Sequence, residues 1–226
     1  MKVIKNKFLL FLVLMTIVSF TLIKTFSQAA SVKVNAWNNN TQQIPGRIQC
    51  ELYDNGGEGI AYHDFDSVNN GSGKLNPANG TFLNEFRMKE GVDISYTKSE
   101  EYDNNPFCLV TPEMGQLYVG WTKPGEWIKY TVNVNITGAY SIACMYTSNG
   151  GGTISFDLDG KVLTDSLSII STRNEKEPLD WRQPHHWNKL ENLAVAKLEK
   201  GIHVLKLKVL ENGKMNLDYI EFKSKN

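Results

Sequence analysis

Two residues of this chain, an indole and a carboxamide, have chemistry that suits recognition of a sugar. Trp121 ends a run in which apolar residues alternate, residues 117–121, and the turn-forming pair Pro124 and Gly125 follows it. Asn216 opens the last apolar run of the chain. An indole can stack on the C–H face of a pyranose, while an amide offers a donor and an acceptor to its hydroxyls. We therefore predict a sugar site at these two residues, against the alternatives of a core tryptophan and a turn-stabilising asparagine.

A second group of aromatic residues lies in the loop at residues 179–187, LDWRQPHHW. Trp181, Trp187 and His186 are candidates for the ring that completes a sugar cleft, although one of them, most readily Trp187, could instead pack inward. His185 and His186 are neighbours, and adjacent side chains on an extended chain point apart. This histidine pair is therefore poor geometry for a metal site.

Acidic and amide oxygens near both ends of the predicted domain suggest a cation site. Gln49 and Glu51 belong to the first predicted strand, and Asp218 lies in the last one. Oxygen ligands of this kind suit Ca²⁺, which takes six to eight of them. The alternative is a solvated strand edge. A second cation site, on weaker grounds, would use acids of the loops: Glu58, Asp64, Asp66 and Asp93.

Catalysis is the competing class of function. Two carboxylates can hydrolyse a glycoside, so a small glycan-active hydrolase using Asp64 or Asp93 is the first alternative. No nucleophile or zinc motif of the GxSxG or HExxH type is visible. A surface adhesion module with a protein partner is the second alternative.

The amino terminus carries the features of a targeting signal. Three lysines precede an apolar run at residues 8–23, and Ser27-Gln28-Ala29 fits a cleavage site. We predict a signal peptide at residues 1–29, a tail or linker at 30–46, and a secreted, extracellular or periplasmic protein. The whole chain has 24 basic and 24 acidic residues, and the signal contains four lysines and no acid, so the remainder carries a net charge of −4. This charge does not favour nucleic acid or an anionic membrane as the partner and favours a neutral or weakly charged one.

Short runs with alternating apolar residues dominate the rest of the chain and predict an all-β domain at residues 47–224. The clearest of them are residues 128–134, 140–146, 154–158, 205–209 and 215–222, with turn signals between them. Many short strands with long loops and no amphipathic helix are typical of a β-sandwich. Cys50 and Cys144 fall in apolar runs and are predicted to be buried, whereas a disulfide at Cys108 stays open.

Taken together, these segments resemble the family 6 carbohydrate-binding modules. The resemblance rests on IQCELYD, GGEGIAYHD, GVDI, VGWTKPGEWIKYTVNV, GGGTISFDLDG, LEKGIHVLKL and NLDYIEF, in this order, and covers residues 48–222. It implies a jelly-roll β-sandwich that binds a polysaccharide or oligosaccharide without catalysis and holds a structural calcium ion. Separately encoded glycoside hydrolases are further partners that it implies.

The resemblance also assigns residues to the implied sites. Trp121 and Asn216 match the sugar-binding aromatic and amide, and Gln49, Glu51 and Asp218 match the calcium ligands. The loop at 179–187 departs from the usual Gly-Gly-Trp, so that Trp181 or a histidine would take the place of the second aromatic ring. The insert at residues 74–114 would close one end of the cleft and favour chain ends. A second surface on the concave sheet, near Trp127, is another expectation of the family.

Overall fold

The computed structural model describes residues 35–71, 86–98 and 102–225. Val34–Asn226 forms one compact unit, to which the architecture below refers. The signal peptide predicted at residues 1–29 lies outside the described residues. None of the helices in the described ranges is long and apolar enough to cross a membrane.

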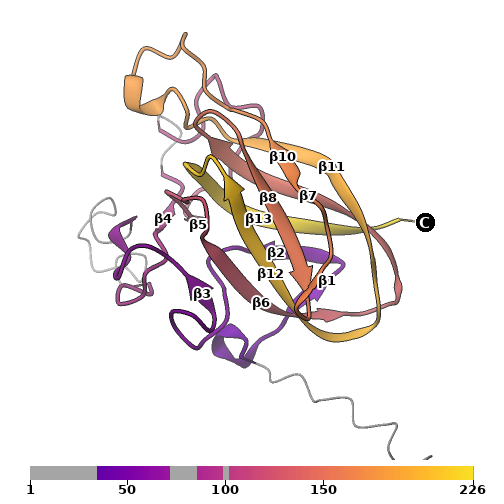
Figure 1. Cartoon of the computed structure of the whole chain (residues 1–226). Coiled ribbons are helices and arrows are strands. Elements are labelled where there is room, and N and C mark those ends of the chain that lie inside the picture. The colour runs from indigo at the N-terminus through magenta and orange to yellow at the C-terminus, as the bar shows by residue number, and fades with distance from the viewer. Residues whose placement is uncertain (1–34, 72–85, 99–101, 226) are drawn as a thin grey trace, which may run out of the picture. The chain divides into compact units, whose positions relative to one another are not determined.

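One sheet of the unit contains seven strands in the described residues (Figure 1). Its main path runs β1-β6-β12-β8-β10, with β3 added beside β6 and β9 beside β8. Their bounds are β1 Gln42–Ile44, β3 Tyr62–His63, β6 Trp127–Val134, β8 Gly152–Leu158, β9 Lys161–Val162, β10 Leu167–Ile169 and β12 Gly201–Glu211. All of these pairings are antiparallel except β1 with β6.

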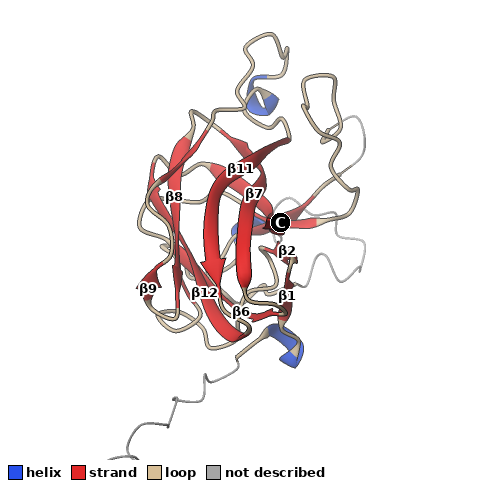
Figure 2. Cartoon of the chain, turned by 90° about the vertical axis from the view of Figure 1, so that its right-hand side faces the viewer, coloured by secondary structure: helices blue, strands red, loops and turns tan. Residues whose placement is uncertain are grey.

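The second sheet contains six strands in the described residues, in the order β11-β7-β13-β5-β4, with β2 beside β13. Figure 2 shows β11 and β7 of this sheet side by side. Every pairing within it is antiparallel. The bounds are β2 Gly46–Gln49, β4 Ile94–Tyr96, β5 Leu117–Val119, β7 Gly138–Ser148, β11 Asn188–Leu198 and β13 Met215–Lys225. Two short 3-10 helices lie outside the sheets, η1 at Trp37–Asn39 and η3 at Asp180–Arg182.

The core lies between the two sheets and is built by the apolar residues of the alternating runs. Ile142 and Phe222 of one sheet and Phe156 and Leu205 of the other are all at most 1% exposed and belong to one cluster. Burial of one face of each sheet is the packing that makes a sandwich stable. The predicted all-β sandwich is therefore confirmed.

Several local predictions differ from the structure. The predicted tail at residues 30–46 contains β1, whose Ile44 is fully buried and pairs with Val134. The strand predicted at residues 48–53 is shorter in the structure: β2 ends at Gln49, and the backbone turns at residues 50–52. All three cysteines are free, so Cys108 forms no disulfide, whereas Cys50 and Cys144 are buried as predicted.

Candidate functional site

A tight contact between two loops positions Trp121 at one end of the sandwich. Trp121 has a left-handed backbone, with φ of 50°, which is strained for a bulky residue. The next residue, Thr122, accepts a hydrogen bond from the backbone N–H of Lys214 at 2.5 Å. A Cβ on Gly213 would lie only 2.0 Å from the Thr122 carbonyl oxygen, so this approach requires glycine. The turn between β12 and β13 therefore holds the Trp121 loop in its strained conformation.

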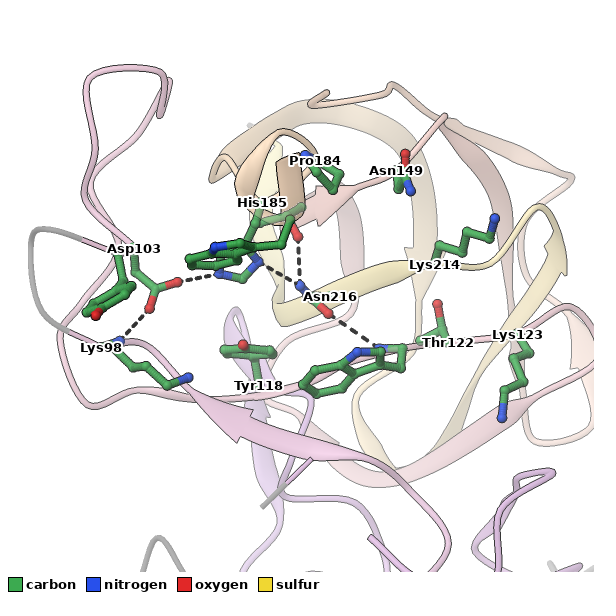
Figure 3. Close-up of a pocket in the computed structure, with 14 residues that line it drawn as sticks. Lys98, Asp103, Tyr118, Thr122, Lys123, Asn149, Pro184, His185, Lys214 and Asn216 are labelled. Carbon is green, nitrogen blue, oxygen red and sulfur yellow. Dashed lines mark hydrogen bonds and ion pairs between the residues drawn. The ribbon is translucent and has the colours of Figure 1, made fainter. Parts of the chain in front are cut away.

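Beside this contact lies a cavity of about 820 Å³, which Figure 3 shows in close-up. The indole of Trp121 is 41% exposed, and that of Trp181, on η3, is 58% exposed. The cavity wall therefore combines exposed rings with polar groups. Its lining residues are Lys98, Tyr102, Asp103, Tyr118, Trp121, Thr122, Lys123, Thr147, Asn149, Trp181, Pro184, His185, Lys214 and Asn216.

Hydrogen bonds fix the orientation of the Asn216 amide in this wall (Figure 3). Its Oδ1 accepts from the backbone N–H of Trp121 at 3.3 Å, and its Nδ2 donates to Oγ1 of Thr147 at 2.8 Å. The same Nδ2 lies 3.0 Å from Nδ1 of His185. An amide nitrogen is a donor, so Nδ1 of His185 accepts and the ring proton sits on Nε2.

Asp103 fixes the other side of the His185 ring. This carboxylate is 1% exposed and forms a short hydrogen bond with Nε2 of His185. It also accepts from the indole Nε1 of Trp187 at 3.2 Å and from the backbone N–H of Lys98 at 2.5 Å. Burial alone would raise the pKa of Asp103, but the hydrogen bonds from His185, Lys98 and Trp187 outweigh burial and lower that pKa. A continuous chain of hydrogen bonds thus runs from a buried carboxylate to the amide beside Trp121.

The loop that carries Trp181 is held by an ion pair with little exposure. Glu177 is 1% exposed, and its Oε1 accepts from Nη2 of Arg182 at 2.8 Å and from the backbone N–H of Leu179 at 3.1 Å. The hydrogen bond from Arg182 is the main reason why the pKa of Glu177 is lowered. The ring of Tyr102 lies 6.1 Å from that of Trp181, between centroids. The second exposed indole thus stands on an anchored loop.

All the residues that line this cavity fall within the range that a family model matches. The model of the carbohydrate binding module, family 6, matches residues 86–224, more than half of the chain. The chain belongs to this family. No curated protein sequence matches it.

Solved structures of low sequence identity are similar to this family 6 module, and one of them reaches a TM-score of 0.50. A family 6 module from Clostridium stercorarium, in complex with cellobiose, superposes with a TM-score of 0.50 at 16% identity, covering 82% of this chain and 98% of that one. A β-1,3-glucan binding family 6 module from Bacillus halodurans covers 82% and 100%, at 16% identity and a TM-score of 0.46. An arabinoxylan arabinofuranohydrolase of glycoside hydrolase family 43 from Bacillus subtilis, in complex with cellotetraose, has a TM-score of 0.49 at 16% identity. The match covers 82% of this chain but only 28% of that enzyme.

Three of the five predicted sugar-site residues line the cavity: Trp121, Asn216 and Trp181. The other two do not. Trp187 directly precedes β11. It is fully buried and packs against Tyr118. His186 is 2% exposed, and its Nδ1 lies 3.0 Å from Oδ1 of Asn105. The placement of Trp187 and His186 in the cleft is therefore wrong.

The sequence reasoning missed His185, which takes the place expected of its neighbour. Side chains alternate along an extended segment, so one histidine of the pair faces the cavity when the other faces the core. We also did not predict the hydrogen bonds of Asp103 or the lysines that line the cavity, because these residues come from the long insert and from turns. Lys98, Tyr102 and Asp103 of that insert line the cavity, and closure of one end by the insert stays a prediction. Residues 72–85 and 99–101 of it lie outside the described part.

The predicted cation ligands lie together where β2 ends beside β13. Gln49 pairs with Tyr219, and the backbone N–H of Cys50 donates to the carbonyl of Asp218 at 2.9 Å. Glu51, which lies in the turn after β2 rather than in the strand, is 5% exposed, and Asp218 is 2% exposed. Oε2 of Glu51 and Oδ1 of Asp218 are buried without a hydrogen-bond partner in the described structure. Buried oxygens of this kind are costly unless a proton or a cation satisfies them.

Burial raises the pKa of both carboxyls. The pKa of Glu51 is about 8, raised first by burial and further by the charge of Asp218. The pKa of Asp218 is about 7, raised by burial and, to a smaller extent, by Glu113. Two carboxylates and a nearby amide are a donor set that suits Ca²⁺. Among the described residues, no group of three or more His, Cys, Asp and Glu is placed to hold a metal, so amide or backbone oxygens would complete the set.

The loop acids are engaged in separate contacts. Glu58 contacts Nδ1 of His63 at 2.6 Å, and Asp66 pairs with Nζ of Lys123 at 2.7 Å. Asp93 accepts from the backbone N–H of Asn70 at 2.7 Å, and Asp64 accepts from that of Asp66 at 2.8 Å. These contacts give no support to a second cation site.

Proposed function

We propose that this family 6 module is a secreted, non-catalytic protein that binds a polysaccharide, or the ends of its chains, in the cavity of Trp121 and Asn216. The observation that carries the proposal is an exposed indole held next to an oriented amide. The ring offers a face for the C–H groups of a sugar, and the amide can exchange hydrogen bonds with its hydroxyls. Trp181, on the anchored loop of η3, is the second ring that the sugar would contact.

The carboxylates of the cavity favour binding over hydrolysis. Asp103 is the one carboxylate among the described lining residues, and both of its oxygens accept hydrogen bonds from the protein. Glycoside hydrolysis by the usual routes needs two carboxyl groups on either side of the bond that is cleaved. Binding without cleavage is therefore the function that these groups suit.

The test is isothermal titration against a polysaccharide chosen from a glycan array, with Trp121→Ala and Asn216→Ala. We expect a wild-type Kd of about 10⁻³ to 10⁻⁵ M, because few contacts are desolvated in a cavity of this size. Both variants should lose binding while their melting temperatures stay near that of the wild type. Phe65→Ala is the matched control, since its ring is 60% exposed outside the cavity. Release of reducing sugar by the wild type would favour the hydrolase instead.

We also propose that a structural calcium ion is held by Glu51 and Asp218, with Gln49 as a further oxygen donor. The two buried oxygens without partners and the raised pKa values of both acids support this assignment. Bound to the folded state alone, the ion would neutralise two carboxylates and stabilise the fold.

A further inference from the structure

The charges of the cavity wall differ in sign from the charge of the chain that forms it. Without the predicted signal peptide, the chain carries a net charge of −4. The cavity, in contrast, is lined by Lys98, Lys123 and Lys214 and by a single acid, Asp103. The overall composition of the chain therefore does not explain why lysines outnumber acids in this wall. Their positions in the fold do.

Asp103 and Lys123 already form hydrogen bonds or an ion pair with other groups of the protein. Asp103 bonds to His185, to the indole of Trp187 and to a backbone N–H. Nζ of Lys123 pairs with Asp66 at 2.7 Å. Asp103 alone cannot balance the charge of the remaining two lysines. The uncompensated charge of the described cavity wall is therefore positive.

Lys98 is partly buried in this wall. Burial lowers its pKa, which the charge of Asp103 partly opposes, and its Nζ lies 4.9 Å from the centroid of the Tyr96 ring. No carboxylate of the described residues lies within ion-pair distance of this ammonium. A desolvated cation without a counter-ion is a binding group for an anion.

Lys214 stands across the cavity from Lys98. Figure 3 shows the two lysines on opposite sides of Asn216. The backbone of Lys214 is left-handed, with φ of 61°, a conformation that glycine or asparagine adopts at lower cost. The same contact that positions Trp121, the hydrogen bond from the Lys214 N–H to Thr122, holds this residue in place. The backbone of Lys214 and the loop of the exposed indole are thus held by one structural feature.

Building on the proposed function, we propose that the glycan recognised in this cavity carries an anionic substituent, a carboxylate or a sulfate ester, which Lys98 and Lys214 bind. The sugar ring stacks on Trp121, and its negative group meets one of the two ammonium groups, which lie on either side of the amide. Chain charge predicts a neutral or weakly charged ligand, but the ligand contacts the charge of the cavity and not the average of the chain. Affinity for such a glycan should fall with ionic strength, since the ammonium groups are open to solvent on one side.

The test uses an array on which each oligosaccharide is printed in three forms, with a hydroxymethyl, a carboxylate or a sulfate at the same carbon. Ligands that bind are then titrated at low and physiological salt. We expect at least one anionic form to bind about tenfold more tightly than its neutral counterpart, with the carboxylate and sulfate arms showing which anion is preferred. The preference should shrink as salt is raised.

Variants assign the preference to the two lysines. In Lys98→Met/Lys214→Met the anionic and neutral forms should bind within about twofold of each other, because methionine keeps the apolar stem without the charge. Lys161→Met, on β9 and exposed, is the control and should keep the full preference. A wild type that binds neutral forms equally well, or a preference that survives in the double variant, overturns the proposal but leaves sugar binding intact. Absence of binding to every glycan overturns the proposed function itself.

Discussion

Removal of calcium should destabilise the protein more strongly at alkaline pH than at acidic pH. The buried carboxyls of Glu51 and Asp218 have pKa values of about 8 and about 7 when no cation is bound. Both values lie above the ordinary range of these groups. The folded, metal-free protein therefore prefers the protonated acids, and this contribution to stability is fully present only below about pH 4. It is lost as the pH rises through 7 and 8.

The size of the effect follows from the same pKa values. Holding Glu51 at a pKa of about 8 rather than 4.5 corresponds to roughly 5 kcal/mol of unfolding free energy once the group ionises without a partner. The proposed Ca²⁺ ion would satisfy the ionised oxygens and remove that loss. If most of this free energy is realised, the melting temperatures with calcium and with EDTA at pH 8.5 should differ by about 10 °C for a domain of this size.

The assay is thermal unfolding of the purified protein at pH 5.5 and pH 8.5, in millimolar CaCl₂ or in EDTA. We expect a small calcium effect at the lower pH and a large one at the higher. In Glu51→Gln, which cannot ionise, the melting temperature in EDTA should depend less on pH. Equal melting temperatures with and without EDTA at pH 8.5 would refute the reasoning, because two ionised, buried carboxylates would then have no measurable cost.

Two further predictions concern the groups that position the sugar site. His185→Phe keeps a ring but removes the acceptor for Nδ2 of Asn216, so glycan affinity should fall in titration calorimetry. Unchanged affinity in the variant would count against the link. Gly213→Ala places a Cβ 2.0 Å from the Thr122 carbonyl oxygen. It should lower the free energy of unfolding by about 2 kcal/mol, and with it the melting temperature and the glycan affinity. Gly138→Ala, where nothing lies within 4 Å of the new atom, is the matched control. Equal melting temperatures for the two alanine variants would contradict the proposed contact.

Several strands could be predicted from the sequence because apolar residues recur at every second position. Residues 128–134 show this pattern and lie within β6, whereas in β13 burial runs unbroken from Leu217 to Ile220. β11 was harder to identify because it is an edge strand that pairs only with β7 in its sheet and carries a bulge between Leu190 and Ala194. The bulge interrupts the alternation.

Residue types predicted part of the site, and tertiary packing decided the rest. Trp121 and Asn216 could be found because each stands where a strand meets a turn. Trp187 and His186 could not be separated from Trp181 by type alone, since their burial depends on which face of the loop meets the sheet. The charge of the cavity was beyond prediction, because it depends on lysines from segments far apart in the sequence.

The central claim is that an exposed indole and an oriented amide bind a sugar at one end of the sandwich. Titration calorimetry of Trp121→Ala against a glycan that the wild type binds tests it most directly. We predict loss of measurable affinity in a variant that melts within about 2 °C of the wild type, since the ring is 41% exposed and its removal opens no large void in the core. Wild-type affinity in this variant would contradict the account.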